Sequence, residues 1–248
     1  MKIDIFTIGK LTIHGYGLMI GIGILCCVFL ACRRAPKKGL SADYIMDIAI
    51  YGIIAGFLGA KLLYIVIEFK SFIQNPLELL GSNGFVVYGG IIAGVLAAMV
   101  YCRIKNIVFM DYFDLAAPSI ALAQGFGRIG CFLAGCCYGR ETESFLGVVF
   151  PENSMAPAGV KVLPTQLFSS AGDFIIMVLL LVYSSKPRKT GETGTLYITL
   201  YAVGRFLIEF LRNDDRGGLW ILSTSQWISL VMLILAVVLT VRIRKKAE

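Results

Sequence analysis

The sequence has little charge and almost no histidine. Only 16% of its 248 residues are Lys, Arg, Asp or Glu, and a single residue is His. Soluble domains carry roughly a quarter charged residues. Hydrophobic residues make up 57% of the chain, and the mean hydropathy is +0.79. This composition excludes a water-soluble globular fold, because the chain has too little polar surface to cover one. No basic soluble face accompanies the net charge of +7, so we expect no nucleic acid as a partner.

A secretory signal is also missing. The N-terminal stretch MKIDIFTIGKLTIHGYG lacks a basic start, an apolar centre and a small-residue cleavage site, so we expect the first apolar segment to be retained. A transmembrane helix needs about 20 mostly apolar residues. The sequence therefore predicts an all-α, polytopic integral membrane bundle of about seven transmembrane helices, with residues 1–248 as a single transmembrane domain. The predicted spans are 11–31, 44–67, 85–101, 112–134, 166–183, 194–211 and 221–241.

The distribution of Lys and Arg predicts the orientation of these spans. Thirteen of the 23 basic residues fall in loops on one side, seven on the other, and Lys61, Arg128 and Arg205 lie within spans. Because basic loops stay in the cytoplasm, we expect the N-terminus outside and the C-terminus in the cytoplasm. The longest connection, 135–165, is then an extracytoplasmic loop or arm, and long loops of this kind often carry function.

Three charged residues, Arg128, Arg205 and Glu209, interrupt apolar spans. A charge within the bilayer costs about 3 kcal/mol even on lenient insertion scales, so such residues usually face a partner, a cavity or a substrate. Arg205 and Glu209 are four residues apart and can form a structural ion pair on one helix face. The alternation of the spans places these groups and other polar residues at one depth. We therefore expect a polar cavity near the outer surface, to which Tyr16, Tyr88, Gln166 and Arg212 also contribute.

Glycines have two expected uses. Gly52, Gly56 and Gly59, together with Gly90 and Gly94, follow spacings that let transmembrane helices approach closely.

A denser group surrounds Arg128 in the stretch GFGRIGCFLAGCCYGR. Here Gly127 and Gly130 would let the backbone and the guanidinium approach a ligand. Arginine suits phosphate because its planar fork donates two hydrogen bonds and its charge persists in a dry site. Arginines at one depth beside lipid point to a phospholipid headgroup. The alternative is that Arg128 only extends to the membrane interface.

Six motifs, in order and spacing, resemble the prolipoprotein diacylglyceryl transferase family along nearly the whole chain. They are HGYGLM, YGGIIAG, DLAAP, GFGRIGCFLAGCCYGR, PTQLF and YAVGRFLIEFLRNDD. The resemblance implies a seven-span enzyme of the bacterial cytoplasmic (inner) membrane. Such enzymes join the diacylglyceryl group of phosphatidylglycerol, by a thioether, to the lipobox cysteine of a preprolipoprotein and release glycerol phosphate.

The resemblance also implies roles for single residues. Arg128 and Arg205 match arginines thought to hold the headgroup and to stabilise the developing phosphate charge, and Glu209 and Arg212 match the neighbouring polar pair. Tyr16 matches an essential tyrosine, and Gln166 lies in the PTQ motif. No cofactor or metal is implied. We assign Arg128, Arg205, Tyr88 and Glu209 to catalysis, and Tyr16, Gly127, Gly130, Gln166, Arg212, Cys131 and Cys136 to substrate binding.

The chain departs from the family where protons are handled. The family has HGG where this chain has Tyr88 followed by two glycines. Its GRxGNFxNxExxG pattern is GRIGCFLAGCCYG here, so Cys131 replaces an asparagine and Cys136 replaces the glutamate. The histidine expected before PTQ is Leu163. A tyrosine, with a reference pKa near 10, is a poor base unless nearby cations lower its pKa.

The thiols of Cys131, Cys136 and Cys137 leave several interpretations open. They can be small apolar filler at a helix end or can form a disulfide, with Cys131 pairing with one of the other two. Metal binding would use an incomplete tetrahedral set, since no histidine is near. The last alternative is a reactive thiolate, activated by Arg128, that accepts or relays the diacylglyceryl group.

Three functions are consistent with these residues. The first is a phospholipid-dependent transferase whose acceptor is the lipobox thiol or a related nucleophile. The second is a protein that binds or transports anionic lipid without transferase chemistry, which the missing histidine and glutamate favour. The third is a thiol-redox membrane protein, which depends on the adjacent cysteines alone and predicts sensitivity to reductant.

Overall fold

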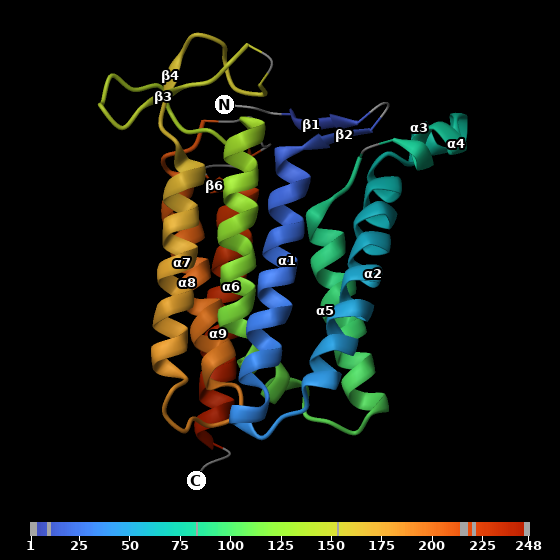
Figure 1. Ribbon diagram of the computed structural model, residues 1–248, viewed down its shortest axis with the longest axis vertical. Coiled ribbons are helices and arrows are strands. Elements are labelled where there is room, and N and C mark those ends of the chain that lie inside the picture. The colour runs from blue at the N-terminus through green and yellow to red at the C-terminus, as the bar shows by residue number, and fades with distance from the viewer. Residues whose placement is uncertain are drawn as a thin grey trace. The chain divides into compact units, whose positions relative to one another are not determined.

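A computed structural model describes residues 4–8, 11–82, 84–152, 154–213, 218–219 and 222–245 (Figure 1). Long helices coincide with all seven predicted spans. They are α1 (Gly15–Arg34), α2 (Ala42–Ile67), α5 (Val87–Ile104), α6 (Phe109–Ala134), α7 (Thr165–Tyr183), α8 (Glu192–Glu209) and α9 (Thr224–Lys245). Among the described residues, all of these helices except α6 and α8 are long and apolar enough, by length and composition, to cross a membrane. The two exceptions are the predicted spans that contain Arg128 and the Arg205–Glu209 pair.

Short elements precede or connect these helices. They are the two-stranded sheets β1 (Asp4–Ile8) with β2 (Leu11–His14), β3 (Val148–Val149) with β4 (Lys161–Val162) and β5 (Gly218–Leu219) with β6 (Leu222–Ser223), a 3-10 turn (Pro36–Lys38), α3 (Phe69–Gln74) and α4 (Pro76–Gly81). The predicted start of the first span, at residue 11, was wrong. Residues 11–14 alternate in polarity and pair with β1 as a hairpin, so the helix begins only at Gly15. Four basic residues that entered the charge count, Lys2, Lys10, Arg216 and Lys246, lie outside the described residues, as does Ile221, the first residue of the last predicted span.

The chain forms two compact units. One contains Met1–Leu30 and Phe113–Glu248, and the other contains Ala31–Tyr112. In the second unit, α2 packs on α5 through the glycines that the sequence singled out. A β-carbon on Gly59 would lie 2.3 Å from Cβ of Ala93 and 2.6 Å from the carbonyl oxygen of Gly89. The predicted close approach of these helices is thus confirmed.

Lys61 is the third cation within a predicted span. Its ammonium group donates a hydrogen bond to the carbonyl oxygen of Ser82 at 2.7 Å.

We predict that Gly59→Ala destabilises the protein by about 1–3 kcal/mol, because the added methyl group would overlap backbone that cannot move away easily. Gly52→Ala is the matched control in the same helix. Its β-carbon would have only the carbonyl oxygen of Gly94 at 4.0 Å, and alanine favours a helix over glycine. Thermal unfolding in detergent measures both effects. Equal melting temperatures for the two variants would contradict the packing argument.

The first unit is a helical bundle with a small-residue core. Ala117, Ala121 and Ala236 lie in this core with Leu180 and Tyr197, which lets α6, α7, α8 and α9 pack closely. The start of α8 is fixed from α6. The carboxylate of Asp114 accepts hydrogen bonds from the backbone N–H groups of Gly191 and Gly194, both at 2.6 Å. The DLAAP motif therefore has a structural use, since Asp114 satisfies N–H groups that the first turn of a helix leaves free.

One end of this unit carries the long connection between α6 and α7 (Figure 1). This connection holds a small core of its own around Phe150 and Val162. Gly139 in the connection fits tightly, because a β-carbon there would lie 2.8 Å from the carbonyl oxygens of Leu163 and Leu211. The end of α6, the start of α7 and the end of α8 are thereby fixed beside one another.

Candidate active site

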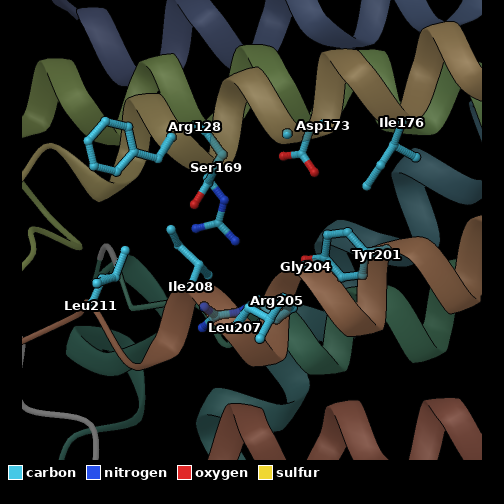
Figure 2. A pocket seen from close by; sticks show the side chains of 12 residues that line it. Arg128, Ser169, Asp173, Ile176, Tyr201, Gly204, Arg205, Leu207, Ile208 and Leu211 are labelled. Atoms are coloured by element: carbon cyan, nitrogen blue, oxygen red, sulfur yellow. The ribbon is translucent and has the colours of Figure 1, made fainter.

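A cavity of about 250 Å³ lies among α6, α7 and α8 in the first unit (Figure 2). Its charged lining residues are Arg128 from α6, Asp173 from α7 and Arg205 from α8, with Tyr201 and Ser169 as further polar residues. The structure therefore brings the two predicted arginines, 77 positions apart in the numbering, to one cavity. Two guanidinium groups facing one hollow create a site for an anion with several oxygens.

Arg205 is held in place by two partners. Its Nη1 atom lies 2.6 Å from Oε2 of Glu209, one turn later in the chain, and its Nη2 atom donates to the hydroxyl of Ser225 at 2.7 Å. The side chains of Arg205 and Glu209 are only 11% and 6% exposed. The expected ion pair is present. Since Glu209 does not line the cavity, it positions Arg205 there. Removing one partner of a buried pair typically costs about 3–5 kcal/mol.

Asp173 was not among the site residues predicted from the sequence. Asp173 is 5% exposed, and its buried Oδ2 atom accepts no hydrogen bond from any described residue. Figure 2 shows its carboxylate directed from α7 toward the cavity that Arg128 and Arg205 also line. A signal was available, because Asp173 is the one acidic residue in the apolar span 166–183. An ionisable group inside a membrane span is a candidate functional residue. This rule singled out the arginines, and it applies equally to the carboxylate of Asp173.

Gln166 lies beside the cavity and not in its lining. It is 1% exposed and donates from Nε2 to the carbonyl oxygen of Cys136 at 2.7 Å. The preceding Thr165 donates from its hydroxyl to the carbonyl oxygen of Cys137 at 2.8 Å. The PTQ motif thus fixes the cysteine-containing turn after α6 to the first turn of α7.

The two glycines beside Arg128 have different surroundings. Gly127 has no atom within 4 Å of the place where a β-carbon would be. A β-carbon on Gly130 would contact Tyr16 and Met19 of α1 at 3.2 Å. Gly130 therefore packs α6 against α1, and Tyr16, 41% exposed, lies at this contact. Only Gly127 adjoins open space, as the predicted role in ligand approach requires.

The remaining predicted residues, Arg212 and Tyr88, are not among the residues that line the cavity. Arg212 follows α8 by three residues, and its backbone forms a bridge with Gly139 of the connection after α6. Tyr88 belongs to the second unit, at the start of α5, and is 42% exposed. The catalytic role assigned to Tyr88 stays a prediction.

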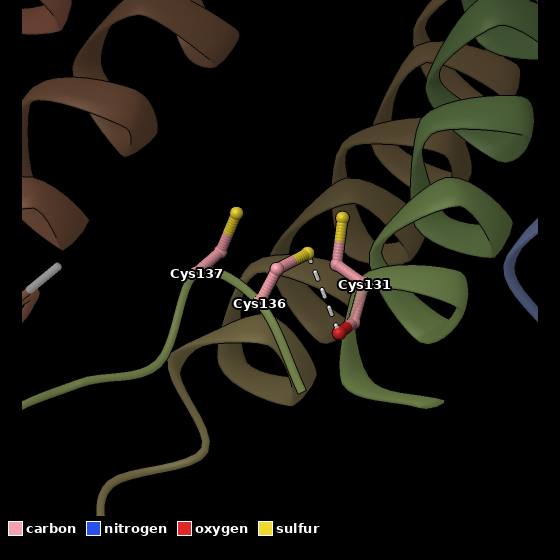
Figure 3. A group of neighbouring side chains, drawn as sticks. All are labelled: Cys131, Cys136 and Cys137. Atoms are coloured by element: carbon pink, nitrogen blue, oxygen red, sulfur yellow. Dashed lines mark hydrogen bonds between the residues drawn. The ribbon is translucent and has the colours of Figure 1, made fainter. Parts of the chain in front are cut away.

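The cysteines converge at the end of α6 (Figure 3). The Sγ atoms of Cys131, Cys136 and Cys137 lie within 4.8 Å of one another. No disulfide joins these three cysteines, so the disulfide alternative is not the state seen here. The Cys136 thiol donates instead to the carbonyl oxygen of Cys131 at 3.7 Å. The three residues are half-buried and form one cluster at the end of the helix.

Comparison with known proteins adds an independent finding. Residues 4–242 match the model of a family described as prolipoprotein diacylglyceryl transferase. The chain is 49% identical to the phosphatidylglycerol–prolipoprotein diacylglyceryl transferase of Clostridium tetani over 239 residues, 96% of each chain. It is 47% identical to phosphatidylglycerol–prolipoprotein diacylglyceryl transferase 2 of Clostridium perfringens, and the match covers 94% of this chain and 92% of that enzyme. Identity to the Staphylococcus haemolyticus enzyme is 34%, over 98% and 88% of the two chains.

Proposed function

The chain belongs to the prolipoprotein diacylglyceryl transferase family, and from this we propose that it transfers the diacylglyceryl group of phosphatidylglycerol to the lipobox cysteine thiol of a prolipoprotein. The reaction forms a carbon–sulfur bond and breaks the bond between the glyceryl carbon and a phosphate oxygen. Its products are a thioether and glycerol phosphate. The protein is a multi-pass helical membrane protein and a transferase, in agreement with its apolar helices and its relatives.

The observation that carries the mechanism is the cavity shared by Arg128 and Arg205. As the carbon–oxygen bond breaks, negative charge grows on the phosphate that leaves. Guanidinium groups fixed in advance beside that position stabilise the growing charge without having to reorganise. The Glu209 carboxylate and the Ser225 hydroxyl support this by holding Arg205 in its cavity-facing conformation.

Asp173 is the proposed proton acceptor. The acceptor thiol must lose its proton to become a good nucleophile, and the family histidine and glutamate are absent from the matching positions. Asp173 lines the same cavity as the two arginines, and its buried Oδ2 atom has no donor among the described residues. The thiol proton passes to this carboxylate, and the sulfur electron pair forms the new bond. Asp173 can later return the proton to the phosphate that leaves.

The membrane arrangement follows from the same proposal. We infer that α6 and α8 also cross the bilayer, which makes seven spans of the bacterial cytoplasmic membrane, with the N-terminus outside and the C-terminus in the cytoplasm. The charges of α6 and α8 are accommodated because Arg128 and Arg205 face the cavity and Asp114 binds the start of α8. The cavity end of the first unit then lies toward the outer leaflet, and residues 135–165 form an extracytoplasmic arm.

The test is turnover by the purified full chain in vesicles that contain phosphatidylglycerol, with a synthetic lipobox peptide. We expect a thioether-linked diacylglyceryl peptide and one glycerol phosphate for each peptide modified, as measured by mass spectrometry. Replacing the peptide cysteine by serine is the control, and it should abolish both products.

The same assay separates the other functions. Glycerol phosphate released without modified peptide would mean a different acceptor. Lipid binding without either product would overturn the transferase and favour a lipid-binding or transport protein. Loss of lipid turnover on adding reductant would favour a thiol-redox protein.

A further inference from the structure

The cysteine cluster at the end of α6 has the geometry of a metal site, independently of the transferase reaction. Cys131 lies in the last turn of α6, and Cys136 and Cys137 follow in the turn after it. The three Sγ atoms lie within 4.8 Å of one another, and Figure 3 shows the side chains projecting from two separate stretches of backbone. A metal–thiolate bond of about 2.3 Å places three sulfur ligands about 4 Å apart in a trigonal set. The thiols therefore need to move by less than about 1 Å to bind one ion.

The backbone of the turn that carries Cys136 and Cys137 is held in a defined conformation. Gly135 and Cys137 both have positive φ, 73° and 65°, and cysteine rarely adopts this conformation. The backbone is held there from α7, since Thr165 donates to the carbonyl oxygen of Cys137 at 2.8 Å and Gln166 to that of Cys136 at 2.7 Å. These two bonds fix the backbone of the turn from which the thiols of Cys136 and Cys137 project. The site is thus organised before any ion binds.

The surroundings favour thiolates. Two arginines, Arg128 and Arg212, lie close enough for their positive charges to act on the sulfur of Cys137. Because the thiolate is the form that binds a metal, the two arginines can offset the negative charge of a three-thiolate complex.

We propose that Cys131, Cys136 and Cys137 bind one soft metal ion, best matched by Cu(I), through three thiolates. Sulfur ligands select soft ions. Among the described residues this cluster has no histidine or carboxylate ligand, so it lacks the fourth ligand of a structural zinc site. Cu(I) is satisfied by three sulfur atoms. Binding releases the thiol protons and requires no oxidation of the cysteines.

The experiment is anaerobic titration of the purified, reduced full chain in detergent with Cu(I), in competition with the chromophoric chelator bicinchoninate. We expect one tightly bound copper ion for each chain, with three sulfur ligands in its X-ray absorption spectrum. Cys131→Ser, Cys136→Ser and Cys137→Ser should each weaken binding by more than about tenfold. The matched control is the double variant Cys26→Ser/Cys27→Ser. It removes two adjacent cysteines from α1, which are not part of the cluster.

Several outcomes would overturn the proposal. These are absence of copper binding under competition, equal binding by all variants, loss of binding in the α1 double variant, or fewer than three sulfur ligands around the bound ion. If a single variant does not fold, as judged by circular dichroism, the sulfur count in the parent protein and the other two variants still decide the question.

Discussion

Arg128→Ala is expected to lower kcat by about 10²–10³-fold, the typical cost of removing one fixed donor from a developing negative charge. Arg128 lines the cavity from α6, where it faces Asp173 on α7 and Arg205 on α8. Arg128→Lys should recover only part of the rate, since an ammonium keeps the charge and loses the planar pair of donors. The measurement is initial rate against phosphatidylglycerol concentration in mixed micelles with the lipobox peptide.

The control is Arg188→Ala, which removes an exposed arginine from the connection between α7 and α8. This variant should retain the parent rate. If Arg128→Ala keeps more than about a tenth of the parent kcat while remaining folded, the proposed phosphate contact is wrong. Arg128 would then be a cation that serves packing only.

Asp173→Asn should have the second large effect, a fall in kcat of about 10²–10⁴-fold, the range that general base catalysis supplies. Asparagine has nearly the same shape as aspartate and cannot accept the thiol proton. The rate of the parent enzyme should fall as the pH is lowered through the titration of the carboxylate, because only the ionised form is a base. In Asp173→Asn this acid limb of the pH–rate profile should be absent.

A purely electrostatic role gives a different result. If Asp173 only balances the charges of Arg128 and Arg205, Asp173→Asn should tighten phospholipid binding and leave the shape of the pH profile unchanged. Glu141→Gln is the matched control, since Glu141 is an exposed carboxylate in the connection after α6. If the pH–rate profile of Asp173→Asn keeps the acid limb of the parent enzyme, the assignment of Asp173 as the base is wrong.

Much of this protein could be predicted from local pattern. Runs of about 20 apolar residues predict helices because the backbone must satisfy its own hydrogen bonds in lipid, and a long helix coincides with each of the seven runs. The glycines of α2 and α5 indicated a close helix contact, because small residues at regular spacing let the backbones of two transmembrane helices approach each other. The cost of charge in a bilayer singled out Arg128 and Arg205 without any knowledge of the fold.

The sequence by itself determined the helices, the candidate arginines and, through six ordered motifs, the family. Tertiary structure alone decided which of these residues share a cavity, because side chains on α6, α7 and α8 meet only through packing between helices. It gave Asp173 a place facing both arginines. It also brought the sulfur of Cys131 next to those of Cys136 and Cys137. The reason is geometric, since the turn that joins them depends on hydrogen bonds from Thr165 and Gln166, nearly 30 residues away in the chain.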